Sequence, residues 1–228
     1  MVNLPANGEA MVEAGVRELL AEACATVNVH TLQPGPTGYS SRLWLAETDE
    51  GPLLVRLPLR SRDPESLRGM LVATRLASEA GITTVRYRAF CPNTPLGPAL
   101  IQEYRPGGRA TEFLKRHPEE LDRVASTVGL WTGMLHRIQR TLFGGILGVS
   151  THATWAQQVK LRVADALKEI DAGVLPVKTE EILAAFERAI GELPKINRAS
   201  LVHADLYFDN VLVHENKAAC LLDFEHAY

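Results

Sequence analysis

Three oxygen-bearing side chains near the end of the chain have the types and the spacing that a phosphoryl transfer would use. They are Asp205, Asn210 and Asp223, in the segments HADLYFDN and LLDFE. The apolar runs that flank them predict a strand before the first segment and a hairpin of two strands between the two segments. Such a hairpin brings Asn210 and Asp223 together at one end, and the loop before it presents Asp205 to the same cleft.

Phosphoryl transfer from a metal-bound nucleotide needs this combination of groups. One carboxylate accepts the proton of the attacking hydroxyl, and an amide oxygen with a second carboxylate holds the Mg²⁺ that bridges the phosphates. The spacing H-x-D-x-x-x-x-N from His203 to Asn210, followed by Asp-Phe-Glu at 223–225, keeps the order of the protein-kinase signature. A single Asp or His at such a corner is more often a structural residue, so the prediction depends on the joint pattern.

The same segment resembles the catalytic loop of the aminoglycoside phosphotransferases and their relatives, the choline, homoserine and fructosamine kinases. A small residue, Ala204, follows the His, Leu206 follows the Asp, and Asn210 precedes a Val-Leu-Val strand. The second motif is Asp-Phe followed by an acidic residue, which is also typical of these families. The resemblance extends over about residues 25–228.

The resemblance implies a role for each polar residue of the segment. Asp205 is expected to be the catalytic base, Asn210 and Asp223 the Mg²⁺ ligands, and His203 a brace of the loop. ATP would be the donor, and the acceptor a hydroxyl of a small molecule, either an aminoglycoside-type antibiotic or a related amino or sugar alcohol. Relatives continue past the Asp-Phe-Glu with several helices, so we expect the 228 residues to be the front part of a longer enzyme.

A loop rich in Pro and Gly is expected to approach the nucleotide phosphates. It spans residues 33–41 and precedes a predicted hairpin with strands at 42–46 and 52–57. Glycine has no side chain to block a phosphate, so backbone amides in such a loop can approach one closely. Ser40 and Ser41 are the expected side-chain helpers.

The second strand of this hairpin carries Arg56, which we expect to bind phosphate. Protein kinases have a Lys at this position, but Leu-Arg-Leu-Pro is common in the resembled family, and a guanidinium can bind phosphate through two parallel hydrogen bonds. A helix at 66–81 follows, with Asp63 as its N-cap. The resemblance expects a Glu on this helix as the partner of Arg56, yet the register places Gly69 there, with Glu65 one turn earlier as the alternative.

Periodicity in the rest of the chain predicts the fold class. The expected segments are a helix at 9–24, a weakly alternating strand at 25–32, strands at 83–90 and 98–102, and helices at 121–136, 153–172 and 179–193. We therefore predict an α+β, bilobal protein kinase-like fold. Its N-terminal lobe is an antiparallel five-stranded sheet with a helix, and its C-terminal lobe is mostly helical and carries the catalytic-loop hairpin.

The change from strand-like to Pro- and Gly-rich composition after residue 102 marks the expected linker between the lobes. Its position predicts that the backbone of Glu103, Tyr104 and Arg105 binds the adenine edge. The predicted division is therefore 1–104 for a nucleotide-binding lobe and 105–228 for a helical lobe.

Composition excludes several other classes of protein. The chain is 46% hydrophobic and 22% charged, which is typical of a folded domain. Its net charge of −3 gives no excess of positive charge for binding nucleic acid. Three widely spaced cysteines suggest a reducing cytoplasm, and no run of 18 apolar residues suggests a membrane span. We expect a cytoplasmic protein without nucleic-acid or membrane partners, and nothing in the pattern indicates an oligomeric state.

Two other interpretations of the motif residues stay open at this point. The first is a nucleotide-binding pseudokinase or interaction module that uses the fold without turnover, because fold alone does not establish activity. The second is a hydrolytic metal site built from His203, Asp205, Asp223 and His226, which leaves Arg56 without a role.

Overall fold

The computed structural model describes most of the chain and leaves short gaps. The described residues are 6–35, 41–59, 64–148, 151–168, 170, 178–192, 195–196 and 198–228. Ser40 and the expected N-cap Asp63 lie outside them. None of the described helices is long and apolar enough to cross a bilayer.

An antiparallel five-stranded sheet forms the N-terminal part, as predicted. Its strands lie in the order β1-β2-β3-β5-β4. Their bounds are β1 Val29–Pro34, β2 Ser41–Thr48, β3 Leu53–Pro58, β4 Tyr87–Cys91 and β5 Ala99–Glu103. The burial of β3 alternates residue by residue, so one of its faces is in the core and the other, with Arg56, faces the cleft.

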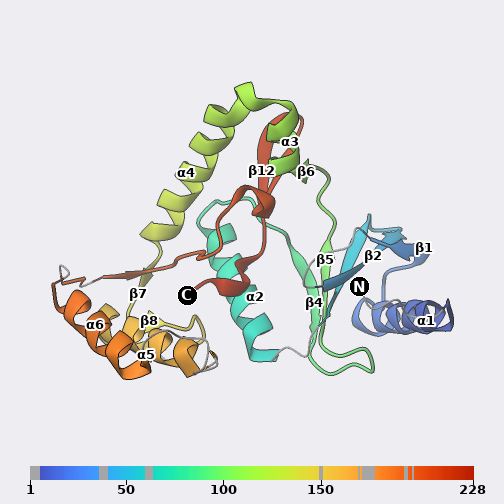
Figure 1. The fold of residues 1–228 in the computed structure, drawn as a ribbon. Coiled ribbons are helices and arrows are strands. Elements are labelled where there is room, and N and C mark those ends of the chain that lie inside the picture. The colour runs from blue at the N-terminus through green and yellow to red at the C-terminus, as the bar shows by residue number, and fades with distance from the viewer. Residues whose placement is uncertain are drawn as a thin grey trace.

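Two helices cover opposite faces of this sheet (Figure 1). Helix α1 (Ala6–Ala23) packs Val16 and Leu20 against one face, and α2 (Pro64–Glu79) packs against the other. The central strand β5 shows the division, because Ile101 belongs to the α1 cluster and Leu100 to the α2 cluster. The sheet is thus held rigidly from both sides.

The C-terminal part is mostly helical, with short strand pairs between the helices. The helices are α3 Ala110–Arg116, α4 Leu121–Arg137, α5 Trp155–Lys168 and α6 Thr179–Glu192, with 3-10 turns η1 Pro118–Glu120, η2 Phe208–Asn210 and η3 Phe224–His226. The short strands β7 Gln139–Arg140 and β8 Phe143–Gly144 pair with β10 Ala199–Ser200 and β9 Thr151–His152, respectively. The predicted helix 153–172 begins two residues later, at Trp155, and is described as α5 as far as Lys168; residues 169, 171 and 172 of the prediction lie outside the described residues.

The predicted catalytic hairpin is present as β11 (Val211–His214) and β12 (Lys217–Leu221). It gains a third strand, β6 (Gly108–Arg109), which comes from the chain just after the linker and pairs with β11. The chain before β4 also joins it, because the Leu221 backbone N–H donates to Thr83 O at 2.9 Å. One hydrophobic cluster then runs from α2 through β12 to η3, so the core is continuous past residue 104 and the two-lobe division stays a prediction.

Candidate active site

The loop that carries the first motif is braced by a buried histidine. His203 is 2% exposed, and its Nε2 donates to Leu222 O at 2.8 Å. Its ring lies 4.6 Å from that of Phe224, centroid to centroid. Burial lowers the pKa of His203, although the bond to Leu222 and the charges of Asp223 and Asp205 oppose this shift. The histidine is therefore a neutral brace that joins the two motifs, which agrees with the role expected for it.

Asn210 is held against Asp205 by its own side-chain amide. Its Nδ2 donates to the backbone O of Asp205 at 2.8 Å and to Oδ2 of the same residue at 3.1 Å. Both amide hydrogens are thereby used, so the carbonyl oxygen of the Asn210 side chain is left as an acceptor or ligand. The neighbouring backbone is also fixed, because the Leu222 N–H donates to Asn210 O at 2.8 Å.

Asp223 follows β12 in a left-handed conformation, with φ 58° and ψ 65°. Asp and Asn tolerate this region better than most residues. Its Oδ1 is buried and forms no hydrogen bond within the described part of the chain. Arg56 NH2 lies 3.5 Å from this oxygen, outside hydrogen-bond geometry but within ion-pair distance.

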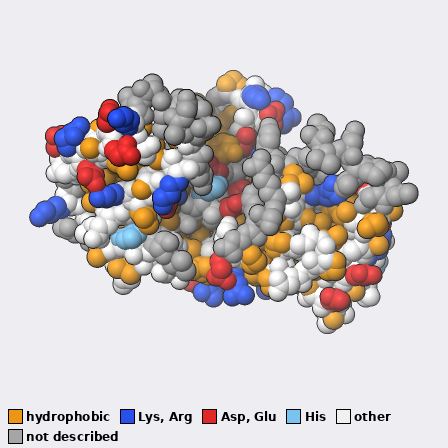
Figure 2. All heavy atoms as spheres, turned by 60° about the horizontal axis from the view of Figure 1, so that its bottom comes forward, with side chains coloured by type: hydrophobic (Ala, Val, Ile, Leu, Met, Phe, Trp, Pro, Cys, Tyr) orange, Lys and Arg blue, Asp and Glu red, His pale blue; other side chains and the backbone are white. Residues whose placement is uncertain are grey.

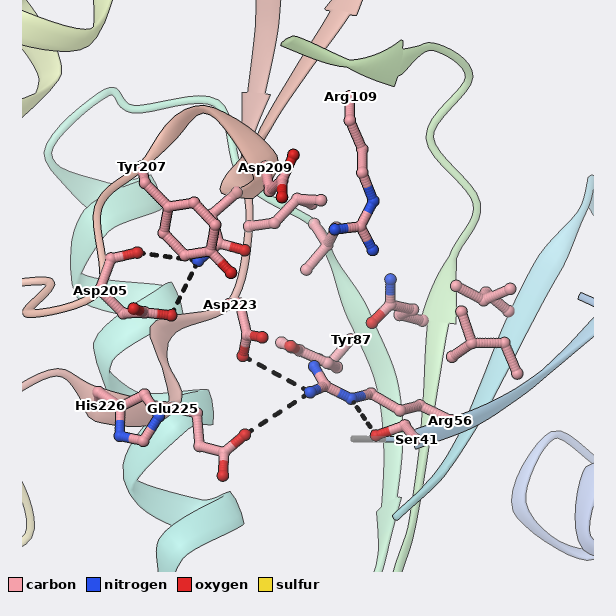
Figure 3. A pocket seen from close by; sticks show the side chains of 16 residues that line it. Ser41, Arg56, Tyr87, Arg109, Asp205, Tyr207, Asp209, Asp223, Glu225 and His226 are labelled. Atoms are coloured by element: carbon pink, nitrogen blue, oxygen red, sulfur yellow. Dashed lines mark hydrogen bonds and ion pairs between the residues drawn. The ribbon is translucent and has the colours of Figure 1, made fainter. Parts of the chain in front are cut away.

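Arg56 reaches from β3 across the cleft to the second motif (Figure 3). Its Nε donates to Ser41 Oγ at 2.9 Å, and its NH2 lies 3.6 Å from Glu225 Oε2. The α2 residue beside it is Met70, whose Sδ is 4.0 Å from NH1. These contacts place Arg56 between the sheet, helix α2 and η3.

The helix position opposite Arg56 is a correction to the sequence prediction. Gly69 faces Ile146 instead, since a Cβ built there would lie 3.0 Å from Ile146 Cγ2. Glu65 forms an ion pair with Arg68 at 3.4 Å. Successive residues of a helix point about 100° apart, so the residue that faces Arg56 is not Gly69 but its neighbour Met70. The register expected from the sequence is thus wrong by one residue.

These residues surround one cavity of about 310 Å³ between the sheet and the catalytic loop. Five of the predicted residues line it: Ser41, Arg56, Asp205, Asn210 and Asp223. Acidic side chains and a histidine gather in a hollow between the side of α5 and α6 and the side of α1 (Figure 2). The cavity therefore brings together the proton acceptor, the oxygen ligands and the cation that the motifs suggested.

The linker residues do not line this cavity, although the preceding residue, Gln102, does. The Glu103 N–H donates to Arg86 O at 2.8 Å and the Tyr104 N–H to Pro52 O at 3.0 Å. The Glu103 carboxylate also pairs with Arg86 and Arg88, at 3.6 and 3.7 Å. Two of the three amides predicted to meet adenine are thus used to anchor the linker to the sheet.

Comparison with known families decides what kind of protein carries this cavity. The model of the phosphotransferase enzyme family matches residues 31–228, which is most of the chain. The chain belongs to this family. The prediction of a small-molecule phosphotransferase is thereby confirmed. No curated protein matches the sequence significantly.

Solved structures with the same fold include several antibiotic phosphotransferases. A thermostable mutant of aminoglycoside phosphotransferase APH(4)-Ia, in a ternary complex with ADP and hygromycin B, is 15% identical, with a TM-score of 0.71 over 93% of this chain and 72% of that one. The streptomycin–ATP complex of APH(2")-IIa is 17% identical, with a TM-score of 0.65 over 100% and 72%. Macrolide 2'-phosphotransferase MphH from Brachybacterium faecium is 18% identical, with a TM-score of 0.57 over 92% and 72%. These neighbours confirm the predicted kinase-like fold class.

The site of this phosphotransferase suits Mg²⁺ better than a hydrolytic metal cluster. Asp223 offers a buried oxygen without a hydrogen bond, and Asn210 offers a side-chain carbonyl. Mg²⁺ prefers such oxygen ligands and takes only one or two carboxylates from the protein, with the rest from phosphates and water. Among the described residues no group of three or more His, Cys, Asp or Glu is arranged to hold a metal, and the Nε2 of His203 is bonded to Leu222 O. The alternative hydrolytic site therefore has no support in the geometry.

Sequence reasoning about this phosphotransferase missed several residues that line the cavity. They are Tyr87, Gln102, Arg109, Tyr207, Asp209 and Glu225, whereas His226 had been considered only for the hydrolytic alternative. Burial raises the pKa of Tyr87 to about 12, so its phenol is neutral beside Arg56. Glu225 and Asp209 are parts of the motifs and their charge could have marked them, whereas Tyr87 and Gln102 lie on strands with no chemical signal in the sequence.

Proposed function

We propose that this phosphotransferase binds Mg-ATP in the cleft and transfers the γ-phosphate to a hydroxyl group of a small molecule. The observation that carries the proposal is the convergence of Asp205, Asn210, Asp223 and Arg56 on one cavity. These groups match what phosphoryl transfer requires, namely a base, oxygen ligands for a cation and a positive charge for the phosphates. In this proposal residues 1–104 form the nucleotide-binding lobe and residues 105–228 the helical lobe.

Each side chain has one task in this scheme. Asp205 orients the acceptor hydroxyl and accepts its proton, since its carboxylate is fixed at the cavity wall by Asn210. Asn210 and Asp223 would hold Mg²⁺, which neutralises charge on the transferred phosphoryl when bound. Arg56 contacts the phosphates from the sheet side, with Ser41 holding its Nε.

The nucleotide part of the proposal has support from the structural neighbours. APH(4)-Ia forms complexes with ADP and AMP-PNP, and APH(2")-IIa forms a complex with ATP. Within the linker, the N–H groups of Glu103 and Tyr104 are used in the sheet. We therefore assign the Arg105 N–H as the backbone donor to adenine.

The acceptor proposed is an amine-bearing antibiotic or a compound of similar chemistry. The cavity is lined by four carboxylates, those of Asp205, Asp209, Asp223 and Glu225, against two guanidinium groups. An excess of negative charge favours a cationic substrate. Hygromycin B, streptomycin and gentamicin, which are named in the neighbouring complexes, are the first compounds to test, with a macrolide as a less basic comparison.

The nucleotide step is tested by thermal unfolding with and without Mg-ATP, followed by ADP release with the acceptor panel. A ligand at 100 times its dissociation constant adds about 2.7 kcal/mol, which raises the melting temperature by about 5–10 °C in a chain of this size. Asp223→Asn should abolish the Mg²⁺-dependent part of this rise, because Asn keeps the left-handed backbone but removes the charge. Asp122→Asn, at the exposed start of α4, is the matched control and should keep the full rise.

The results separate three possibilities. A rise that needs Mg²⁺, together with ADP release in the presence of an acceptor, supports the proposed enzyme. A rise without turnover on any hydroxyl compound would favour the nucleotide-binding alternative. A protein that unfolds cooperatively but shows no rise would overturn the nucleotide site.

A further inference from the structure

We propose that Glu225 is the positioning residue that holds Arg56 for the nucleotide phosphates, in place of a carboxylate on helix α2. This inference rests on the proposed function, because it concerns the same nucleotide site. It assigns to the third residue of the Asp-Phe-Glu motif a role that the motif pattern alone does not contain.

The first support is the set of atoms around the Arg56 guanidinium. Nε donates to Ser41 Oγ at 2.9 Å, and NH2 lies between Asp223 Oδ1 at 3.5 Å and Glu225 Oε2 at 3.6 Å. The side chains of Arg56 and Glu225 are both only 13% exposed, so this ion pair is shielded from water on most sides (Figure 3). A partly buried pair is screened less by salt than one on the surface.

The second support is the side chain that α2 presents to Arg56. It is Met70, whose thioether cannot carry a charge, and Gly69 faces Ile146. The α2 side chain in contact with Arg56 therefore carries no charge, and the carboxylates paired with the guanidinium come from the segment after β12.

The third support is that Asp223 has a second proposed partner. Its Oδ1 is the oxygen that pairs with Arg56 and also the buried oxygen proposed for the cation. A divalent ion bound at Asp223 would compete with Arg56 for this carboxylate, and a second anion would then keep the guanidinium in place. Glu225 supplies it, two residues further along the chain.

Glu225 is also held firmly enough to position another side chain. It lies in η3, next to Phe224, which is 1% exposed in the cluster that includes α2 and β12. Its backbone is therefore anchored in the core, and its carboxylate extends into the cleft. The resulting ion pair joins the sheet to η3, the segment that follows the catalytic hairpin.

A double-mutant cycle on nucleotide affinity tests this role. We expect Glu225→Gln to raise the Kd for Mg-ATP about tenfold, Arg56→Gln to raise it at least as much, and the double variant to be no weaker than Arg56→Gln alone. Glu225→Asp keeps the charge with a shorter reach and should lose less than Glu225→Gln. Glu215→Gln, at the exposed tip of the β11–β12 hairpin, is the matched control and should bind like the wild type.

The Mg²⁺ dependence distinguishes a positioning residue from a metal ligand. For a positioning role the defect of Glu225→Gln persists at saturating Mg²⁺, and the melting temperature without ligand shows that the variant is folded. Losses that add in the double variant, or a defect that disappears as Mg²⁺ is raised, would overturn the inference while leaving the nucleotide site intact. If the wild type itself binds no nucleotide, the proposed function falls first and this inference with it.

Discussion

The two sides of the cleft hold their functional side chains in different ways. On the loop side, the bonds are short and lie within residues 203–223: Asn210 binds Asp205 five residues away, and His203 binds the backbone O of Leu222, next to Asp223. On the sheet side, Arg56 meets Ser41 across one strand pair but meets Asp223 and Glu225 only across the cleft. The loop side is thus complete within one segment of chain, whereas the sheet side is completed by the other part of the molecule.

In the proposed function, this difference separates catalysis from nucleotide placement. Asp205, the proposed base, and Asn210, a proposed cation ligand, are preorganised by the hydrogen bonds between them. Arg56, the proposed cation for the phosphates, depends on longer ion pairs of 3.5 and 3.6 Å. A change on the loop side should therefore affect turnover, and a change on the sheet side should affect nucleotide affinity.

The largest expected effect comes from removing Asp205, the proposed base. Asp205→Asn should lower the rate of phosphoryl transfer by about 10²–10⁴, the usual contribution of a general base. Nucleotide binding should stay, because the backbone O of Asp205 still accepts from Asn210 Nδ2 and the amide keeps the size of the side chain. The rate is measured as ADP release with the acceptor, and the binding as the Mg-ATP-dependent rise in melting temperature.

Asp165→Asn, on the exposed face of α5, is the control for the removal of one carboxylate. It should leave both the rate and the binding unchanged. If Asp205→Asn lost nucleotide affinity to the same degree as rate, the loop side would not be independent of the sheet side, and the comparison between them would fail.

Much of the fold follows from sequence because it depends on short-range patterns. The alternation of apolar residues predicted the sheet, and the return of the chain at 214–217 appears as a turn with Glu215 and Asn216 at positive φ. The bounds were less accurate where pattern and packing disagree. The strand expected at 83–90 begins at Tyr87, because the backbone of Thr83 and Thr84 is used to bind β12 instead.

The sequence indicated residues on both sides of the site, including Arg56 and Ser41, but it predicted the arrangement only on the loop side, for a physical reason. Asp205, Asn210 and Asp223 are placed by a hairpin whose register is visible in the sequence. The partners of Arg56 depend on how the sheet, α2 and η3 pack, and a one-residue error in the register of α2 exchanged Gly69 for Met70. The β6 strand, which joins the linker to β11, left no signal because it is two residues long.

The next largest effect is expected on stability, from a substitution beside β6, the short strand that pairs with β11. Gly107 has φ 134°, and a Cβ there would lie 2.7 Å from the backbone O of Val213. Gly107→Ala should therefore lower the free energy of unfolding by about 2–3 kcal/mol, since backbone atoms of β11 must move.

The adjacent glycine provides a matched control for this change. A Cβ on Gly108 meets nothing within 4 Å, so Gly108→Ala should change the free energy of unfolding by less than about 0.5 kcal/mol. Both values come from urea unfolding. Equal effects of the two substitutions would show that the contact between the linker and β11 does not support the hairpin.

The smallest expected effect is the pH dependence that the buried brace imposes on the loop side. Burial lowers the pKa of His203 in the folded protein, so at mildly acidic pH the unfolded chain binds a proton that the folded chain excludes. The free energy of unfolding should therefore fall as pH drops below about 6.5, the pKa of a histidine in the unfolded chain, toward the pKa of His203 in the folded protein. The slope is at most about 1.4 kcal/mol per pH unit for one proton.

His203→Gln should remove this part of the slope, whereas His214→Gln, on the exposed hairpin, should keep it. Urea unfolding of the three proteins between pH 5 and 7.5 measures the difference. A slope that survives in His203→Gln would mean that His203 is not the group that titrates.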